Sequence, residues 1–377
     1  MKIGLITYNR AHSYGAVLQC YATNKKLQDL EVEFETIDYN PYFFRKMYYL
    51  LCKFTSLRHP GIKSRLYKLF IYKTIRNRTK NFENFIEKNF YLSSKQYMDF
   101  DDINRNCNDY DVYITGSDQV WNSVCGNFDK VFFLDFDDAK VKKRYSFAAS
   151  FGMTSIPIDL LDEYRSRLNG YENYSVREKT GAKLIRELTG KQAIISCDPT
   201  FMLMADEWKS IEDDSYVPSN PYVLVYYVTP TKDLQKAAQK LAKEKNLDVV
   251  CVPCYLSYEV LSGKNDREFK QKFFPSCSPE GFIALCHNAS YVLTNSFHGT
   301  VFSVIFQKSF ISQYEITKGE YNNRSQELLE QLEITNRDLT EDLENIDEPI
   351  DWDNVAHKIS SMRREAINYL EAIGGKK

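Results

Sequence analysis

The chain has 377 residues, of which 43% are hydrophobic and 14% aromatic, and its formal net charge is −2. This length exceeds what one hydrophobic core usually holds, so we expect two domains. A net charge so close to zero creates no strong overall field, which argues against nucleic acid as a partner. The nine cysteines are odd in number and scattered, which is typical of reduced thiols in a cytoplasm rather than of a disulfide framework.

The amino terminus leads directly into strand-like sequence. MKIGLITYNR has neither the apolar core nor the small-residue cleavage site of a secretory peptide. No stretch approaches the roughly 18 apolar residues that a membrane span needs. We therefore expect a cytoplasmic protein without a transmembrane helix.

The first half of the chain alternates between strand and helix patterns. Residues 2–8 predict a buried strand, residues 15–30 have the apolar spacing of a helix, and residues 32–38 predict a second strand. This order predicts a parallel sheet. Further strands are expected at 110–115, 143–149 and 192–197.

The second half repeats the alternation after a polar linker at 212–220. Its expected elements are strands at 222–228, 248–252, 291–294 and 309–313, and helices at 232–245, 279–287 and 299–306. Two such α/β halves resemble the GT-B architecture, in which two Rossmann-like domains face a cleft. We expect domains at 1–212 and 221–345, followed by a final helix within 350–377 that packs back on the first domain.

The segment 39–82 differs in character from the rest of the first half. It contains eleven cations and no acidic residue, and we expect a helical insert, at 43–90, to the first domain. Aromatic residues lie between the cations, a pattern that fits contact with an anionic membrane but equally fits a solvated basic helix. The cations are Arg45, Lys46, Lys53, Arg58, Lys63, Arg65, Lys68, Lys73, Arg76, Arg78 and Lys80.

The strongest local motif is TNSFHGT at 294–300, between a strand and a helix. Open α/β sheets bind ligands at the carboxyl ends of strands, and helix amino termini attract anions. His298 at this position could donate a proton or pair with a phosphate, and Gly299 would allow the backbone to approach a ligand closely. The alternative is a helix-capping turn with a structural histidine.

A second motif, GSDQVWN at 116–122, also follows a strand. Asp118 and Gln119 could bind sugar hydroxyls, and Trp121 could stack on a sugar ring. The alternative is a capped helix start with Trp121 in the core. Nothing in the local sequence decides between these readings.

Weaker signals lie elsewhere. Arg177 in SVREK, at the end of a short strand, could clamp a carboxylate or phosphate in bidentate fashion, or it could lie on a solvated helix. Asp198 in DPT fits a turn cap, and Arg324 opens an amphipathic helix. The Cys251–Cys254 pair lacks the second pair that a zinc site needs, and we expect no metal and no cofactor.

Taken together, these motifs resemble the polysaccharide pyruvyl transferase family. The resemblance rests on an ordered series of strings between residue 13 and about residue 330: SYGAVLQCYA, ITGSDQVWN, YSFAASFG, SVREKTG, DPTFML, LVYYV, NASYVLTNSFHGTVFSVIF and the NxRxxxLL pattern at 322–329. It implies phosphoenolpyruvate as donor and a pair of glycan hydroxyls as acceptor. We expect this acceptor on a lipid-linked oligosaccharide at the cytoplasmic membrane face.

The resemblance also implies roles for particular residues. His298 matches the family histidine and would be the general acid, with Asp118 as a second catalytic candidate. The expected donor-binding residues are Arg177, Arg324, Asn295, Ser296, Gly299 and Thr300. The expected acceptor-binding residues are Tyr14, Gly15, Gln19, Ser117, Gln119, Trp121 and Asn122. Some family branches carry an arginine two residues before the histidine, where this chain has Ser296, and Arg324 is the expected substitute.

Two other classes of function remain open on the sequence. A nucleotide-sugar glycosyltransferase would share the architecture, and Glu280 is the acidic residue that could bind a ribose. A glycan-binding protein without catalytic activity would not depend on His298 or Arg177 for binding.

Overall fold

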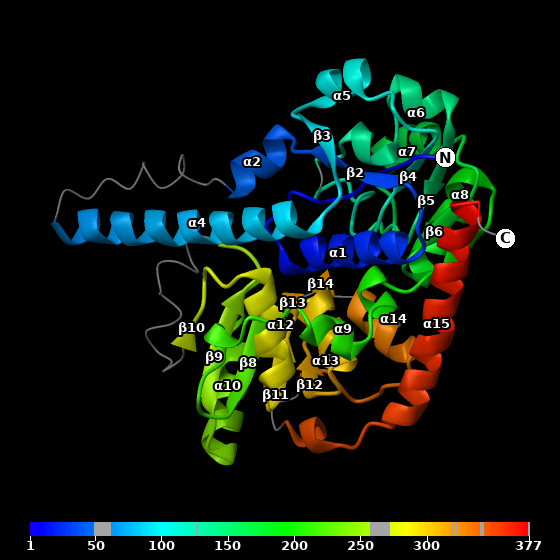
Figure 1. Ribbon diagram of the computed structural model, residues 1–377. Coiled ribbons are helices and arrows are strands. Elements are labelled where there is room, and N and C mark those ends of the chain that lie inside the picture. Colours follow the sequence, from blue (N-terminus) through cyan, green and yellow to red (C-terminus); the bar gives the residue numbers. More distant parts are fainter. Residues whose placement is uncertain are drawn as a thin grey trace.

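The computed structural model describes residues 1–48, 62–125, 127–256, 272–317, 320–321, 323–339 and 343–375. The chain folds into two α/β halves, one above the other in Figure 1. This confirms the predicted fold class.

The first half contains a five-stranded parallel sheet in the order β3-β2-β1-β4-β5. Its strands are β1 (Ile3–Ile6), β2 (Phe34–Tyr39), β3 (Leu92–Tyr97), β4 (Val112–Thr115) and β5 (Lys143–Ser146). A parallel pair, β6 (Tyr174–Val176) and β7 (Ala193–Ile195), continues beyond β5 through isolated bridges, one of which joins Ala149 to Val176. The carboxyl ends of β6 and β7 therefore lie at the same edge as those of β1 and β4.

The second half repeats this topology in the order β10-β9-β8-β11-β12. Its strands are β8 (Tyr222–Tyr227), β9 (Asp248–Pro253), β10 (Lys272–Phe273), β11 (Tyr291–Thr294) and β12 (Ser309–Ser312). All six residues of β8 are buried, as expected for a central strand covered by helices on both faces. Each sheet reverses its strand order at its centre, between β1 and β4 and between β8 and β11.

The main helices of both halves follow the strands along the chain. They include α1 (Tyr14–Asp29), α10 (Lys232–Lys245), α12 (Pro279–Asn288) and α13 (Phe297–Ile305). The amino terminus of α13 is capped by Ser296, whose Oγ accepts from the Gly299 amide. Because this cap starts the helix two residues earlier than predicted, His298 belongs to the first turn of α13 rather than to the preceding loop.

The hydrophobic core joins the two halves. One cluster contains Tyr14 of α1, Phe282 of α12 and Phe302 of α13. The last helix, α15 (Trp352–Ile373), runs along both halves at one side of the molecule (Figure 1). Its Tyr369 stacks on Phe147 of the first half, with ring centroids 6.3 Å apart.

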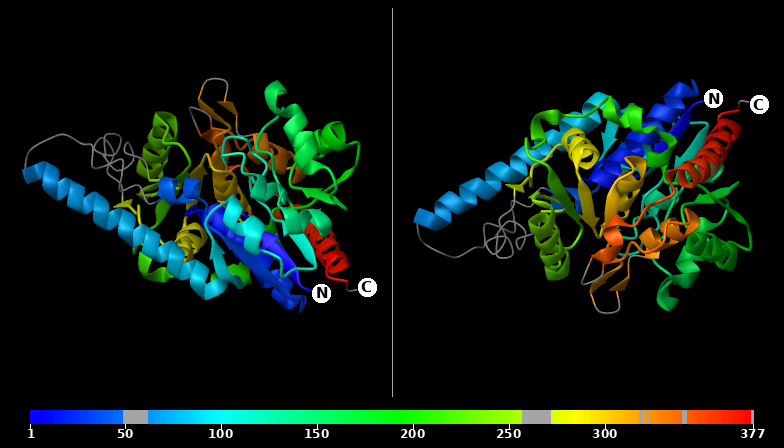
Figure 2. Two further views of the ribbon diagram at one scale, coloured as in Figure 1. Left: turned by 90° about the horizontal axis from the view of Figure 1, so that it is seen from above. Right: turned by 90° about the horizontal axis from the view of Figure 1, so that it is seen from below.

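The basic insert forms α2 (Tyr42–Tyr48) and the long helix α4 (Ile62–Asn89), whose amino-terminal part projects from the body in Figure 1 and Figure 2. From residue 71 onward, α4 buries one stripe and exposes Lys73, Arg76 and Lys80 on the other side. Lys53 and Arg58, and the side chains of Lys63, Arg65 and Lys68, lie outside the described part of the chain.

Arg78 does not belong to this exposed basic face. It is 4% exposed, and its Nη2 donates to the Cys254 carbonyl oxygen at 2.6 Å and to that of His12 at 3.2 Å. Its Nη1 donates to the carbonyl oxygen of Pro275 at 3.0 Å. Arg78 therefore bridges the two halves and is not available to a membrane surface.

The remaining elements are short. They are α5 (Phe100–Asn106), η1 (Lys130–Phe133), α6 (Asp137–Val141), η2 (Ile158–Leu160), α7 (Leu161–Leu168), α8 (Lys179–Thr189), η3 (Pro199–Met202), α9 (Ala205–Lys209), η4 (Asp214–Tyr216), β13 (Glu315–Thr317), β14 (Glu320–Tyr321), α14 (Asn323–Gln331) and η5 (Glu344–Asp347). Among the described helices, none has the length and apolar character needed to cross a bilayer.

Candidate active site

The candidate site lies where the loops at the carboxyl ends of the two sheets meet. The loop after β1 leads into α1, and the loop after β11 leads into α13. A Cβ placed on Gly15 would lie only 1.9 Å from Nδ1 of His298. The imidazole from the second half therefore packs directly against the first turn of α1 from the first half.

Arg177 follows β6 and is 6% exposed. Its Nη1 donates to Asp198 Oδ2 at 2.7 Å, and its Nε lies 3.7 Å from Glu178 Oε2. Its Nε and Nη2 find no hydrogen-bond acceptor among the described residues. Burial by itself would lower the pKa of Arg177, but attraction by Asp198, Glu178 and Asp118 raises it. A buried guanidinium with unused donors is suited to bind an anionic group.

Arg324 lies close to Arg177 on the same aromatic ring. The guanidinium carbons of Arg177 and Arg324 are 4.4 and 5.5 Å from the centre of the Phe297 ring. Burial and the charge of Arg177 lower the pKa of Arg324, more strongly than Glu178 and Asp118 raise it. The two guanidinium groups repel each other, and an anionic ligand would relieve this repulsion.

Both arginines line one pocket, which encloses about 360 Å³ including its open mouth. Its polar lining also includes Asp198, Glu178 and Glu327. Glu327 of α14 accepts hydrogen bonds from Thr180 in the first turn of α8, so this contact closes one side of the pocket between the halves. The two expected donor-binding arginines therefore come from different halves, Arg177 from the first and Arg324 from the second.

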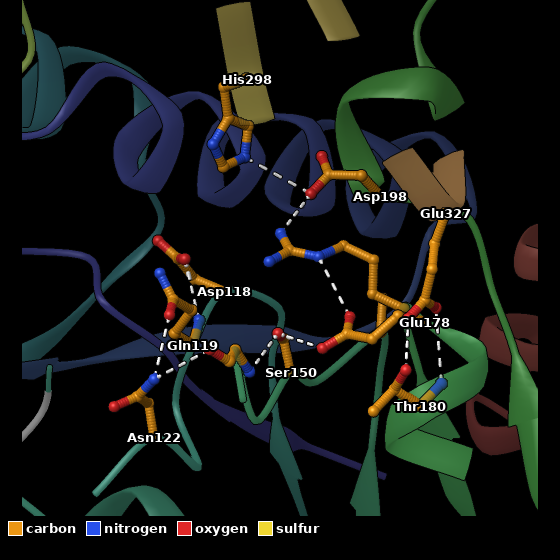
Figure 3. A network of polar contacts seen from close by, with 12 residues as sticks. Asp118, Gln119, Asn122, Ser150, Glu178, Thr180, Asp198, His298 and Glu327 are labelled. Carbon is orange, nitrogen blue, oxygen red and sulfur yellow. Dashed lines mark hydrogen bonds and ion pairs between the residues drawn. The ribbon is translucent and has the colours of Figure 1, made fainter. Parts of the chain in front are cut away.

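His298 is 7% exposed, and its Nε2 lies 3.4 Å from Asp198 Oδ2 (Figure 3). Burial by itself would raise the pKa of Asp198, but the neighbouring His298 and Arg177 hold it well below its usual range. Asp198 is therefore an ionised carboxylate between a histidine and an arginine. The predicted turn cap is present, because Asp198 Oδ1 accepts from the Thr200 amide at 3.0 Å. The second oxygen, Oδ2, faces Arg177 and His298.

The loop after β4 brings three polar side chains below His298 in the view of Figure 3. Asp118 has a left-handed backbone with φ of 77°, and its Oδ1 accepts from the Gln119 amide at 2.8 Å. Asn122 donates to the Gln119 carboxamide oxygen at 3.1 Å. A non-glycine residue in this conformation is uncommon and often marks a functional loop.

Four of the expected acceptor residues are fully buried. Trp121 is 0% exposed and packs against Phe133, Phe151 and Tyr171, which is the core position left open as the alternative. In this structure its ring is not available to stack on a sugar. The other three are also buried: Tyr14 donates to the Cys277 carbonyl oxygen, Gln19 donates to Thr7, and Ser117 is 0% exposed.

The residues around His298 shape its loop. Asn295 accepts from the Val228 amide and donates to the Thr229 carbonyl oxygen. Thr300 Oγ1 lies 2.8 Å from Ser312 Oγ. A Cβ on Gly299 would meet Thr294 Oγ1 at 2.2 Å, so this position is closed to larger residues. These side chains, with the capping Ser296, hold the strand–helix junction instead of facing the pocket.

Sequence reasoning gave no role to Phe297, Glu178 or Arg78. Phe297 is the ring shared by both arginines, and Glu178 accepts a short hydrogen bond from Ser150 next to Arg177. Both lie inside quoted motifs, yet no local pattern distinguishes them. Arg78 was counted among surface cations because its burial depends on contacts far away in the sequence.

Metal binding finds no support from side-chain placement. No group of three or more His, Cys, Asp or Glu side chains is arranged around a common point in the part of the chain described here. Cys251 and Cys254 are buried thiols, and Cys254 Sγ lies 3.4 Å from Ser13 Oγ.

The doubled 3-2-1-4-5 sheet order, with polar and charged loops facing each other between the halves, defines a GT-B-like two-domain protein. Solved structures with this fold include Anabaena Alr3699/HepE in complex with UDP-glucose, which is 10% identical and has a TM-score of 0.58 over 99% of this chain and 100% of that chain. They also include S. aureus MnaA with UDP, at 14% identity and a TM-score of 0.54 over 99% and 96% of the two chains. A UDP-N-acetylglucosamine 2-epimerase is 11% identical, with a TM-score of 0.54 over 100% and 96%. At these identities the likeness concerns the fold alone.

The family assignment is more specific. Residues 14–312 match the family model of the polysaccharide pyruvyl transferases, and the chain belongs to this family. No curated protein sequence matches the chain significantly. The match covers the loops that carry Gly15, Asp118, Arg177, Asp198 and His298. The family supports transfer of a pyruvyl group to a polysaccharide.

Proposed function

We propose that this protein transfers the pyruvyl group of phosphoenolpyruvate to two hydroxyls of a sugar and forms a ketal. The observation that carries the proposal is the pair of guanidinium groups of Arg177 and Arg324 on one Phe297 ring, close to His298. Phosphoenolpyruvate carries a carboxylate and a phosphate on one carbon. Two mutually repelling cations in one pocket fit a ligand with two adjacent anionic groups.

The chemistry assigns a task to each group. Protonation of the donor's methylene carbon by His298 leaves an oxocarbenium-like centre, which one sugar hydroxyl attacks. Phosphate then leaves, and a neighbouring hydroxyl closes the ketal ring. One hydroxyl proton replaces the proton that His298 gave to carbon, and the other leaves with the phosphate. The reaction therefore balances without a redox partner or a metal.

The acceptor would lie against the loop after β4. Asp118, Gln119 and Asn122 offer carboxylate and amide groups that can orient a diol. Gly15 keeps the imidazole within reach because it has no side chain there. We propose these four residues as the acceptor side, with Arg177 and Arg324 as the donor side.

A nucleotide-sugar glycosyltransferase is the competing hypothesis, because a diphosphate could also bind two arginines. The acidic residue expected to bind its ribose, Glu280, lies in the first turn of α12. A thermal-shift panel separates the two. Phosphoenolpyruvate at about 100 times its Kd should stabilise the protein by about 2.7 kcal/mol, whereas UDP-sugars should not. Stabilisation by UDP-sugars alone would support the glycosyltransferase, and unimpaired glycan binding without His298 and Arg177 would support a non-catalytic binding protein.

We also propose that the protein works at the cytoplasmic face of a membrane, on a polyprenyl-pyrophosphate-linked oligosaccharide. The exposed cations Lys73, Arg76 and Lys80 on the outer side of α4, together with the exposed Tyr72, support this proposal. Each basic residue near an anionic leaflet contributes about 1 kcal/mol.

A further inference from the structure

Asp198 connects two charged groups that come from different halves of the molecule. It follows β7, is 2% exposed, and begins the turn that leads into η3. Its Oδ1 is used locally, because it accepts from the Thr200 amide at 3.0 Å and from Thr200 Oγ1 at 2.6 Å. Its Oδ2 is left to face the site.

That second oxygen meets both candidate functional groups. Arg177 Nη1 of the first half donates to it at 2.7 Å, and His298 Nε2 of the second half lies 3.4 Å away. The latter is an ion-pair contact, somewhat longer than a direct hydrogen bond. One carboxylate oxygen therefore accepts a hydrogen bond from the arginine and faces the imidazole, whose buried Nε2 has no hydrogen-bond partner among the described residues.

The position of the His298 ring indicates which of its two nitrogens is available to transfer a proton. A Cβ on Gly15 would lie 1.9 Å from Nδ1 and nearly equally far from its two ring neighbours, at 2.4 Å from Cγ and 2.5 Å from Cε1. Such a point lies over the face of the ring, so α1 supports the imidazole from one side. Nε2 faces Asp198, and Nδ1 lies on the side of the ring away from Asp198 (Figure 3).

We propose that Asp198 is a positioning residue that holds His298 through Nε2, so that Nδ1 is the atom that transfers the proton. This proposal rests on the proposed function in one respect, because that function makes phosphoenolpyruvate the molecule that accepts the proton. The Nδ1 proton of the imidazolium passes to the methylene carbon of the donor, and the Nε2 proton stays on the side of Asp198. The neutral imidazole then takes up the proton of the attacking hydroxyl at Nδ1, which restores the starting state.

The charges around this pair favour an ionised Asp198. Arg177 and His298 hold its pKa well below the usual range although burial alone would raise it. Further charges come from three other places: Glu178 beside Arg177, Asp118 in the loop after β4, and Arg324 in α14. Asp198 is therefore an ionised carboxylate that Nε2 of His298 faces, in a site that also holds the two cations Arg177 and Arg324.

The test is an NMR measurement of the ring nitrogens of His298 in the free protein, which depends on neither donor nor acceptor. The resonances are assigned by their absence in His298→Gln. In Asp198→Asn the preference of the neutral ring for a proton on Nε2 over Nδ1 should fall by about tenfold or more, because a neutral amide replaces the carboxylate that Nε2 faces. Thr200→Val is the matched control, since it removes a partner of the same carboxylate but keeps the charge, and it should keep this preference. An equal loss of the preference in both variants, or no loss in Asp198→Asn, would overturn the proposal.

A second measurement needs no substitution. The nitrogen chemical shifts of neutral His298 in the wild-type protein should show the proton on Nε2, and a proton on Nδ1 would also overturn the proposal. With an active enzyme, Asp198→Asn should lower kcat by about tenfold or more, whereas Thr200→Val should keep it, because only the first change removes the charge that Nε2 faces. If phosphoenolpyruvate is not the donor, the kinetic readout disappears but both NMR results stand, so the two failures are distinguishable.

Discussion

Replacing Gly15 by alanine adds one methyl group at the point where the two halves meet. The new Cβ would lie 1.9 Å from His298 Nδ1, whereas ordinary van der Waals contact begins at 3.4 Å. The separation must therefore grow by about 1.5 Å, which is the difference between these two distances. The imidazole is buried and carries the 3.4 Å contact to Asp198, so this shift changes the geometry on which proton transfer depends.

A misplacement of about 1 Å costs roughly 100-fold in rate, so we expect turnover of Gly15→Ala to fall by about that factor. Overpacking should cost about 1–3 kcal/mol of stability. The protein should therefore remain folded while it loses activity.

The assay compares phosphate release from phosphoenolpyruvate with thermal unfolding. Gly181→Ala in the first turn of α8 is the matched control, because the nearest atom to its new Cβ would be Val176 Cβ at an ordinary 3.4 Å. That variant should keep its turnover. Wild-type turnover in folded Gly15→Ala would refute the claim that the position of the His298 ring controls the reaction.

Three further substitutions test separate parts of the account. His298→Gln should lower kcat by about 100-fold without unfolding the protein, and near-normal kcat would remove His298 from the acid role. Arg324→Gln should raise the Tm of the free protein, because it removes a charge disfavoured by burial and by Arg177, yet it should weaken phosphoenolpyruvate binding about tenfold or more in calorimetry; tighter or equal binding would contradict the clamp. Reversing the charges of Lys73, Arg76 and Lys80 to glutamate should abolish salt-sensitive co-sedimentation with anionic vesicles but leave activity on a soluble acceptor intact. Wild-type protein that ignores anionic vesicles at low salt would end the membrane proposal.

Patterns within single elements predicted the fold well. The alternation of apolar strands and amphipathic helices placed β1, α10 and β11 within one or two residues of their observed bounds, because each is buried by the same sheet–helix packing. Strand β3 was missed because its sequence, LSSKQY, is polar and lies at the edge of its sheet, where apolar alternation is weak.

The site could be predicted only where position along a strand carries the information. His298, Asp118 and Arg177 follow the carboxyl ends of β11, β4 and β6, and this common feature made them candidates. Whether a strand-end residue faces the pocket or the core depends on tertiary packing, which buries Trp121 in the core. The shared roles of Asp198 and Phe297 depend on contacts between the two halves, which no local pattern contains.

Mass spectrometry of a lipid-linked oligosaccharide, incubated with the protein and carbon-13-labelled phosphoenolpyruvate, tests the central claim most directly. The account predicts that the glycan gains one labelled pyruvate minus one water, that phosphate is released in equal amount, and that His298→Gln abolishes both. A glycan that stays unlabelled with phosphoenolpyruvate but gains a sugar from a UDP-sugar would contradict it.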